Sequence, residues 1–111
     1  MANAANAAIG TPAAAHVIDD GTLSAFFETM AVLMDAGIQI DEALSMLAED
    51  AAGTFKATYG SMYEQVAAGH TLAKAMEASG AFPTYATTLV TQGTTMGRLH
   101  ETLMSLARYY G

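Results

Sequence analysis

Apolar side chains recur every three or four positions from Leu23 onward, which is the spacing of an amphipathic α-helix. Polar residues fill the positions between them, among them Ser24, Glu28 and Asp35. The pattern therefore predicts a first helix that starts near Thr22. Its apolar stripe consists of Leu23, Phe26, Phe27, Met30, Leu33 and Met34.

The same period continues through five more segments, separated by glycine, proline or a capping residue. Their apolar stripes begin at Ile40, Phe55, Leu72, Phe82 and Leu99. A left-handed glycine ends a helix without steric strain, threonine caps an N-terminus, and proline fits a first turn. The residues predicted to form turns and caps are Gly37, Gly69, Thr71, Pro83, Gly93 and Gly97.

No segment of useful length alternates with period two, and the linkers are only a few residues long. Short linkers make successive helices antiparallel neighbours. We therefore expect an all-α fold, a six-helix antiparallel bundle over residues 22–111, built as helical hairpins around one core. Residues 1–21 are rich in alanine and lack an apolar stripe, so they are predicted to be a flexible tail.

Two stretches echo each other, residues 36–44 and 68–76, because both read A-G-x-x-apolar-x-x-A-apolar. This form is typical of a helix end, a tight turn and a new helix. Only the turn is required by backbone geometry, so the likeness is also compatible with coincidence.

The formal charge is −7, and the four basic residues Lys56, Lys74, Arg98 and Arg108 are scattered. Binding to nucleic acid or to an anionic leaflet needs clustered basic residues, so neither partner is expected. A basic protein surface would be attracted, although a solvated acidic face that maintains solubility explains the same charge. The chain has no cysteine, which excludes disulfides and thiolate sites. Its most apolar stretch, 23–38, carries two carboxylates, so no membrane span is predicted.

Candidate chemistry is sparse. The histidines, His16, His70 and His100, form neither an HExxH pattern nor the Glu-x-x-His pair of di-iron bundles. We therefore predict no catalytic residue, no metal ligand and no cofactor. The segment Gly93 to Gly97 makes a weak phosphate loop, because no strand precedes it and no lysine follows, so we interpret it as a helix break.

Two alternatives stay open at this point. Calcium accepts carboxylates in loose geometry, so the acidic pairs could bind an ion shared between subunits, or they could simply be solvated helix ends. These pairs are Asp19-Asp20, Asp41-Glu42 and Glu49-Asp50. The eight methionines fill a core adaptably and could also form a forgiving partner surface.

Ordered motifs across residues 24–110 resemble a known family. The first is Ala36-Gly37-Ile38 followed by Glu42-Ala43-Leu44. The second, residues 66–76, is similar to v-x-x-G-x-[ST]-L-x-x-A-[LM], and Phe82-Pro83 resembles a helix start that follows it. The last runs from Leu89 through Gly97-Arg98-Leu99 to Tyr109-Tyr110. In this order they resemble the type II secretion F domain of the GspF and PilC platform proteins.

The resemblance implies a six-helix bundle that is usually present twice in its parent, on the cytoplasmic face of the bacterial inner membrane. It also implies a scaffold without enzymatic activity, which self-associates and contacts the assembly ATPase and other inner-membrane components of a type II secretion or type IV pilus machine. The family usually has Glu where this chain has Thr94, so no binding role is inherited there. The alternative function is a small ligand- or metal-binding helical bundle, with an enzyme as one form of it.

Overall fold

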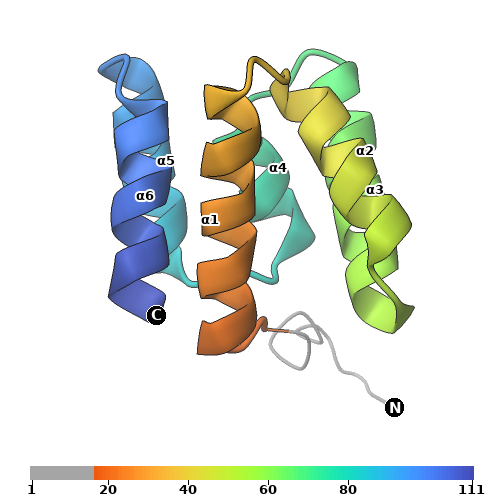
Figure 1. Cartoon of the computed structure of the whole chain (residues 1–111). Helices are drawn as coiled ribbons and strands as arrows, with labels where there is room; N and C mark the ends of the chain where they lie inside the picture. Colours follow the sequence, from red (N-terminus) through yellow and green to blue (C-terminus); the bar gives the residue numbers. More distant parts are fainter. Residues whose placement is uncertain (1–16) are drawn as a thin grey trace.

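Six helices form the fold in a computed structural model that describes residues 17–111 (Figure 1). Their bounds are α1 Asp20–Asp35, α2 Ile40–Asp50, α3 Gly53–Ala67, α4 Leu72–Ser79, α5 Thr84–Thr95 and α6 Leu99–Tyr110. No strand occurs in this part of the chain. The predicted all-α, six-helix bundle is confirmed.

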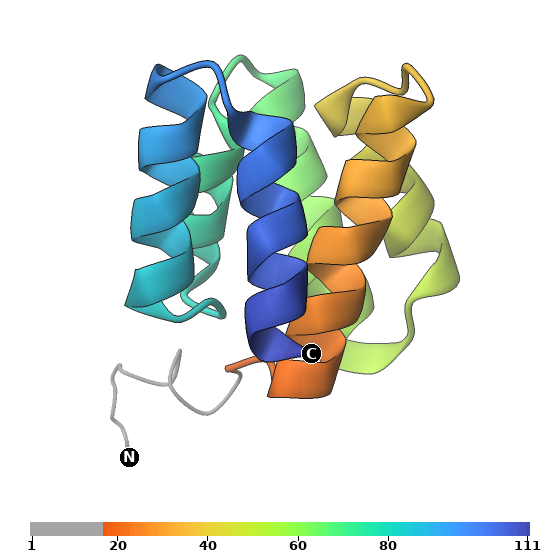
Figure 2. The same cartoon turned by 60° about the vertical axis from the view of Figure 1, so that its left-hand side comes forward.

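The helices are arranged in a closed cycle. Each contacts the next one along the chain, and α1 closes the cycle against α6, its most extensive neighbour. Figures 1 and 2 show α1 and α6 side by side, and in Figure 1 α4 and α5 lie behind them. The hydroxyl of Ser24 on α1 donates to the carbonyl of Ala107 on α6 at 2.8 Å. The first and last helices are therefore joined directly, although 83 positions separate these two residues.

A single core fills the middle of the bundle. Its largest side chains with essentially no exposed area are Phe27, Leu23, Met30, Leu44, Met62, Met76, Leu103, Leu106 and Val90. Aromatic rings connect distant segments: Phe26 of α1 stacks on Tyr59 of α3 with ring centroids 5.3 Å apart, and lies 5.1 Å from Phe82 in the α4–α5 loop. Three of the eight methionines belong to this set, so the methionines serve the core at least in part.

The folded part begins earlier than the sequence predicts. Helix α1 starts at Asp20 rather than near Thr22, and Ile18 is 2% exposed. The backbone N–H of Ile18 donates to the carbonyl of Ala81 at 3.0 Å, which fixes this residue to the α4–α5 loop. The predicted tail boundary at residue 21 is therefore too late, because a single buried isoleucine gives no periodic signal. Residues 1–16 of that tail lie outside the described residues.

Three turns join the helices into hairpins at the same end of the bundle, the upper end in Figure 1. Gly37, Gly69 and Gly97 occupy them with φ of 88°, 107° and 70°. In each turn the next residue's N–H bonds back five positions, from Ile38 to Leu33 at 2.9 Å, from His70 to Gln65 at 3.0 Å and from Arg98 to Gly93 at 2.7 Å. These are Schellman motifs, and two of them account for the sequence echo.

Gly93 and Pro83 differ from the predicted roles. Gly93 lies inside α5 and breaks nothing, since the helix continues to Thr95. A Cβ atom at Gly93 would lie 2.2 Å from the Oγ1 atom of Thr102, so glycine is required there by the close approach of α6. Pro83 is the N-cap of α5, one position before its first turn.

Thr71 is the N-cap of α4, and its Oγ1 atom accepts the N–H of Lys74 at 3.1 Å. Thr71→Ala removes that acceptor and is expected to lower the free energy of unfolding by about 1 kcal/mol, measured by urea denaturation. Thr95→Ala is the matched control, because the exposed Thr95 hydroxyl only bonds to its own helix at Thr91. Equal losses in both variants would contradict the capping role.

Candidate interaction surface

The histidines and carboxylates, which are the side chains best suited to acid–base chemistry or metal binding, do not form a cluster in the described residues. Nε2 of His100 lies 3.9 Å from Oδ1 of Asp35, an ion pair only when the histidine is protonated, and the two side chains are 40% and 81% exposed. His70 occupies the exposed α3–α4 turn, and His16 lies outside the described residues. Between residues 17 and 111, no three His, Asp or Glu side chains are grouped so that they could hold a metal ion.

The acidic pairs lie at exposed helix ends. The Oδ1 atom of Asp41 accepts the N–H of Glu42 at 2.8 Å in the first turn of α2. At the other end of α2, Nζ of Lys56 donates to the carbonyl of Ala48 at 3.0 Å and that of Glu49 at 3.5 Å. A lysine bonded to terminal carbonyls stabilises a helix C-terminus. This arrangement is that of a capped, solvated helix end.

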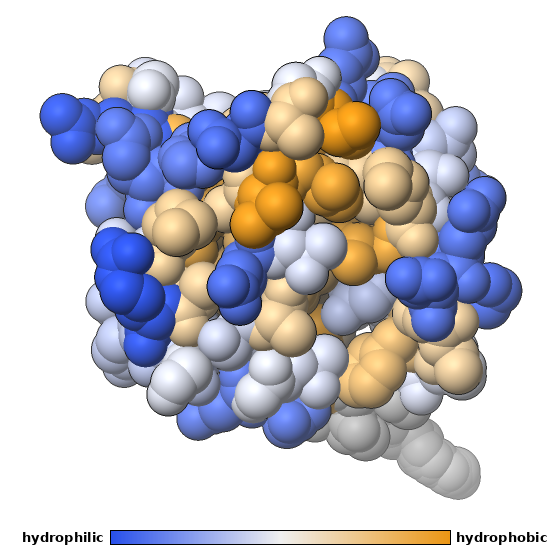
Figure 3. All heavy atoms as spheres, in the orientation of Figure 1, coloured by the Kyte–Doolittle hydropathy of each residue, from blue (hydrophilic) through white to orange (hydrophobic). Residues whose placement is uncertain are grey.

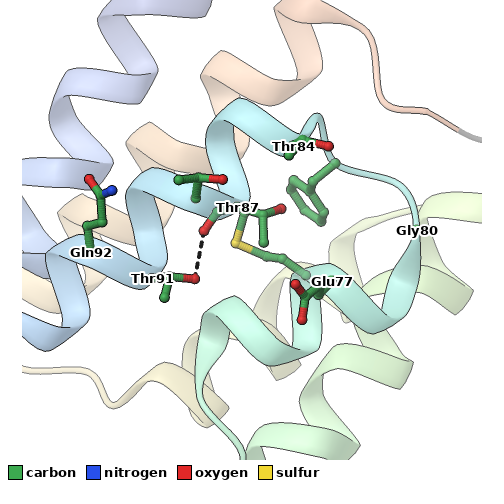
Figure 4. A pocket seen from close by; sticks show the side chains of 9 residues that line it. Glu77, Gly80, Thr84, Thr87, Thr91 and Gln92 are labelled. Atoms are coloured by element: carbon green, nitrogen blue, oxygen red, sulfur yellow. Dashed lines mark hydrogen bonds between the residues drawn. The ribbon is translucent and has the colours of Figure 1, made fainter.

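A groove of about 500 Å³ lies between α4 and α5 (Figure 4). Its walls are Met76, Glu77, Gly80, Phe82, Thr84, Thr87, Thr88, Thr91 and Gln92. The hydroxyl of Thr91 donates to the carbonyl of Thr87 at 2.9 Å, so its proton is already used within α5. Glu77 is the only charged side chain of the groove. The other polar groups of the lining are threonine hydroxyls and the Gln92 amide.

Apolar side chains reach the surface on the α1–α2 side. Figure 3 shows apolar residues gathered across the upper middle of the face that carries these helices. Val32 of α1 is 56% exposed and Met46 of α2 is 43% exposed. Exposed apolar surface of this kind is common where a protein meets a partner.

A second exposed group was missed by sequence reasoning. Tyr85 of α5 and Tyr109 of α6 are 49% and 64% exposed, and their ring centroids are 4.8 Å apart. Neither residue has a place in the apolar stripes, and that mismatch was the available signal. The ring centroid of the adjacent Tyr110 is 4.9 Å from that of Tyr109. Burial raises the pKa of Tyr110, and the nearby Tyr109, Asp20 and Tyr85 raise it further.

Comparison with protein families matches residues 26–111 to the family described as type II secretion system (T2SS), protein F. The match covers α2 to α6 in full and most of α1. The chain belongs to the type II secretion system protein F family. The suspected resemblance is thereby confirmed. This family belongs to the secretion machinery and takes its name from an inner-membrane protein. A search of curated proteins gives no match.

None of the helices that the structure describes is long and apolar enough to cross a membrane. Thr94, where the resemblance leads us to expect Glu, is exposed, and its hydroxyl donates to the carbonyl of Val90 at 2.8 Å. That hydroxyl is used inside α5.

Proposed function

We propose that this bundle is a scaffold domain on the cytoplasmic face of the inner membrane, in the platform protein of a type II secretion or type IV pilus machine. It acts by binding. In this role the domain self-associates, contacts the assembly ATPase and other inner-membrane components, and couples the ATPase to pseudopilin or pilin assembly. The observation that carries the proposal is the family match over residues 26–111.

The surface chemistry supports a binding role. The exposed apolar side chains Val32 and Met46, the exposed pair Tyr85 and Tyr109, and the groove between α4 and α5 all offer contact area. The net charge of −7 favours basic partner surfaces. ATP hydrolysis in this scheme belongs to the partner.

Affinity-tagged chain mixed with the purified assembly ATPase of the same organism tests the proposal. The ATPase is expected to be retained and the chain alone to hydrolyse no ATP, while sedimentation velocity shows concentration-dependent self-association. An unrelated helical domain of similar net charge is the control for charge alone. A strict monomer that retains neither the ATPase nor any neighbouring assembly component would contradict the proposal.

A further inference from the structure

The end of the bundle opposite the three hairpin turns brings together the start of α1, the start of α5 and the end of α6. Figures 1 and 2 both place the C-terminal end of α6 beside the beginning of α1. Three tyrosines gather there, and we call Tyr85, Tyr109 and Tyr110 the tyrosine cluster. The ring centroids of Tyr85 and Tyr109 are 4.8 Å apart, with an interplanar angle of 38°. Those of Tyr109 and Tyr110 are 4.9 Å apart, with an interplanar angle of 90°.

The tyrosine cluster packs against the hydrophobic core through Tyr110. The ring of Tyr110 stacks on that of Phe27 with centroids 6.1 Å apart, and Phe27 has no exposed area. All three tyrosines stand on helices, and a tyrosine side chain has only two rotatable torsions, so little conformational entropy is lost on binding. Tyrosines with these properties are enriched among the residues that dominate protein interfaces.

A carboxylate, that of Asp20 in the first turn of α1, lies near the cluster. The carboxylate of Asp20 acts on Tyr110 strongly enough to contribute to its raised pKa, after burial and the Tyr109 ring. Asp19 precedes it, and a hydrogen bond from the Thr22 side chain lowers the pKa of that carboxyl. Arg108 is exposed on α6 beside Tyr109, but adjacent helical residues point about 100° apart. Aromatic faces next to carboxylates suit a cation.

We propose that the tyrosine cluster and Asp20 bind an arginine-bearing segment of a partner protein, whose guanidinium stacks on the exposed tyrosine rings and pairs with the carboxylate. Arginine fits better than lysine because its planar group stacks on aromatic rings and is more weakly hydrated. This proposal adds the chemistry of one contact surface to the proposed function. It rests on that function in one respect, namely that the partner is a protein.

A membrane surface is the competing occupant, because tyrosine also favours the lipid–water interface. The carboxylate of Asp20 near the cluster argues against it, since the cytoplasmic leaflet is anionic and repels acidic groups. The overall charge of −7 acts in the same direction. A basic protein segment satisfies both the aromatic and the acidic groups.

NMR titration of the ¹⁵N-labelled chain tests the inference. The probes are an acetylated peptide with four arginines, the same peptide with lysine in their place, and vesicles of phosphatidylcholine with phosphatidylglycerol. We expect the arginine peptide to shift the amide signals of Asp20, Tyr85, Tyr109 and Tyr110, and to bind roughly threefold more tightly than the lysine peptide.

Substitutions locate the binding surface. The double variant Tyr85→Ala with Tyr109→Ala is expected to weaken peptide binding about tenfold, and Asp20→Asn about threefold. Tyr63→Ala is the control, because Tyr63 is another exposed helical tyrosine, on α3 at 37% exposure, and no ring contact joins it to the cluster. It should bind as the unsubstituted chain does. Thermal unfolding checks that each variant is folded.

Three results would overturn the inference. The first is that neither peptide binds at concentrations up to ~1 mM. The second is that the double variant binds each peptide as tightly as the unsubstituted chain does, and the third is that the chain binds vesicles and the double variant does not. These outcomes leave the proposed function testable by itself. Retention of the assembly ATPase by the double variant at full strength would show that the platform role stands while this surface is not the contact.

Discussion

Replacement of Phe27 by alanine is expected to lower the free energy of unfolding by ~3–5 kcal/mol. Its side chain has no exposed area, and its ring lies 5.3 Å from Phe26, 6.1 Å from Phe82 and 6.1 Å from Tyr110. Removal of the ring leaves a cavity where α1, α6 and the α4–α5 loop meet. Since domains of this size have ~5–15 kcal/mol in total, the variant should lose a large share of its free energy of unfolding.

Urea denaturation followed by circular dichroism measures this loss. Phe55→Ala provides the comparison, because Phe55 is 36% exposed at the start of α3 and its ring contact is with Tyr59 at 6.3 Å. We expect this variant to lose less than ~1.5 kcal/mol, in proportion to the smaller area buried. If the two substitutions lowered the free energy of unfolding equally, Phe27 would not be the central contact between α1, α6 and the α4–α5 loop.

Gly93→Ala is expected to destabilise the bundle by ~1–3 kcal/mol, although alanine is the better helix former. The new methyl group would lie 2.2 Å from Oγ1 and 2.9 Å from Cβ of Thr102. The Thr102 hydroxyl is held by its hydrogen bond to the carbonyl of Arg98 at 2.8 Å, so it cannot rotate away without losing that bond. Helices α5 and α6 must separate to relieve the contact.

Gly60→Ala makes the same substitution in an open position. Gly60 lies inside α3, and a Cβ atom there would have nothing within 4 Å. Alanine should therefore raise the free energy of unfolding by up to ~1 kcal/mol through its higher helix propensity. Opposite signs for the two variants in urea denaturation are the expected result. A stabilising Gly93→Ala would show that α5 and α6 are not in close contact.

The helices were largely predictable because each has a strong apolar period and an explicit end signal. The stripe from Leu23 to Met34 specifies α1, and Gly37 and Gly69 each specify the turn of a separate hairpin, through local chemistry alone. Ile18 was missed because its burial depends on Ala81, which is 63 positions away in sequence, the difference between 81 and 18. Local patterns carry no information about such a contact.

Gly93 illustrates a second limit. A glycine in sequence is compatible with a turn or with close helix packing, and only the position of Thr102 decides between them. The candidate surfaces were harder still, since the tyrosine cluster forms between α5 and α6 and no single helix encodes it. What was predictable about function is membership of the family, which came from the ordered motifs.

The most direct test of the platform role is the dissociation constant of the full chain for the cognate assembly ATPase, measured by biolayer interferometry at physiological salt. The account predicts saturable binding at ~100 μM or tighter that an unrelated acidic helical domain does not compete away. A response that stays linear with concentration, or that the acidic control abolishes, would contradict it.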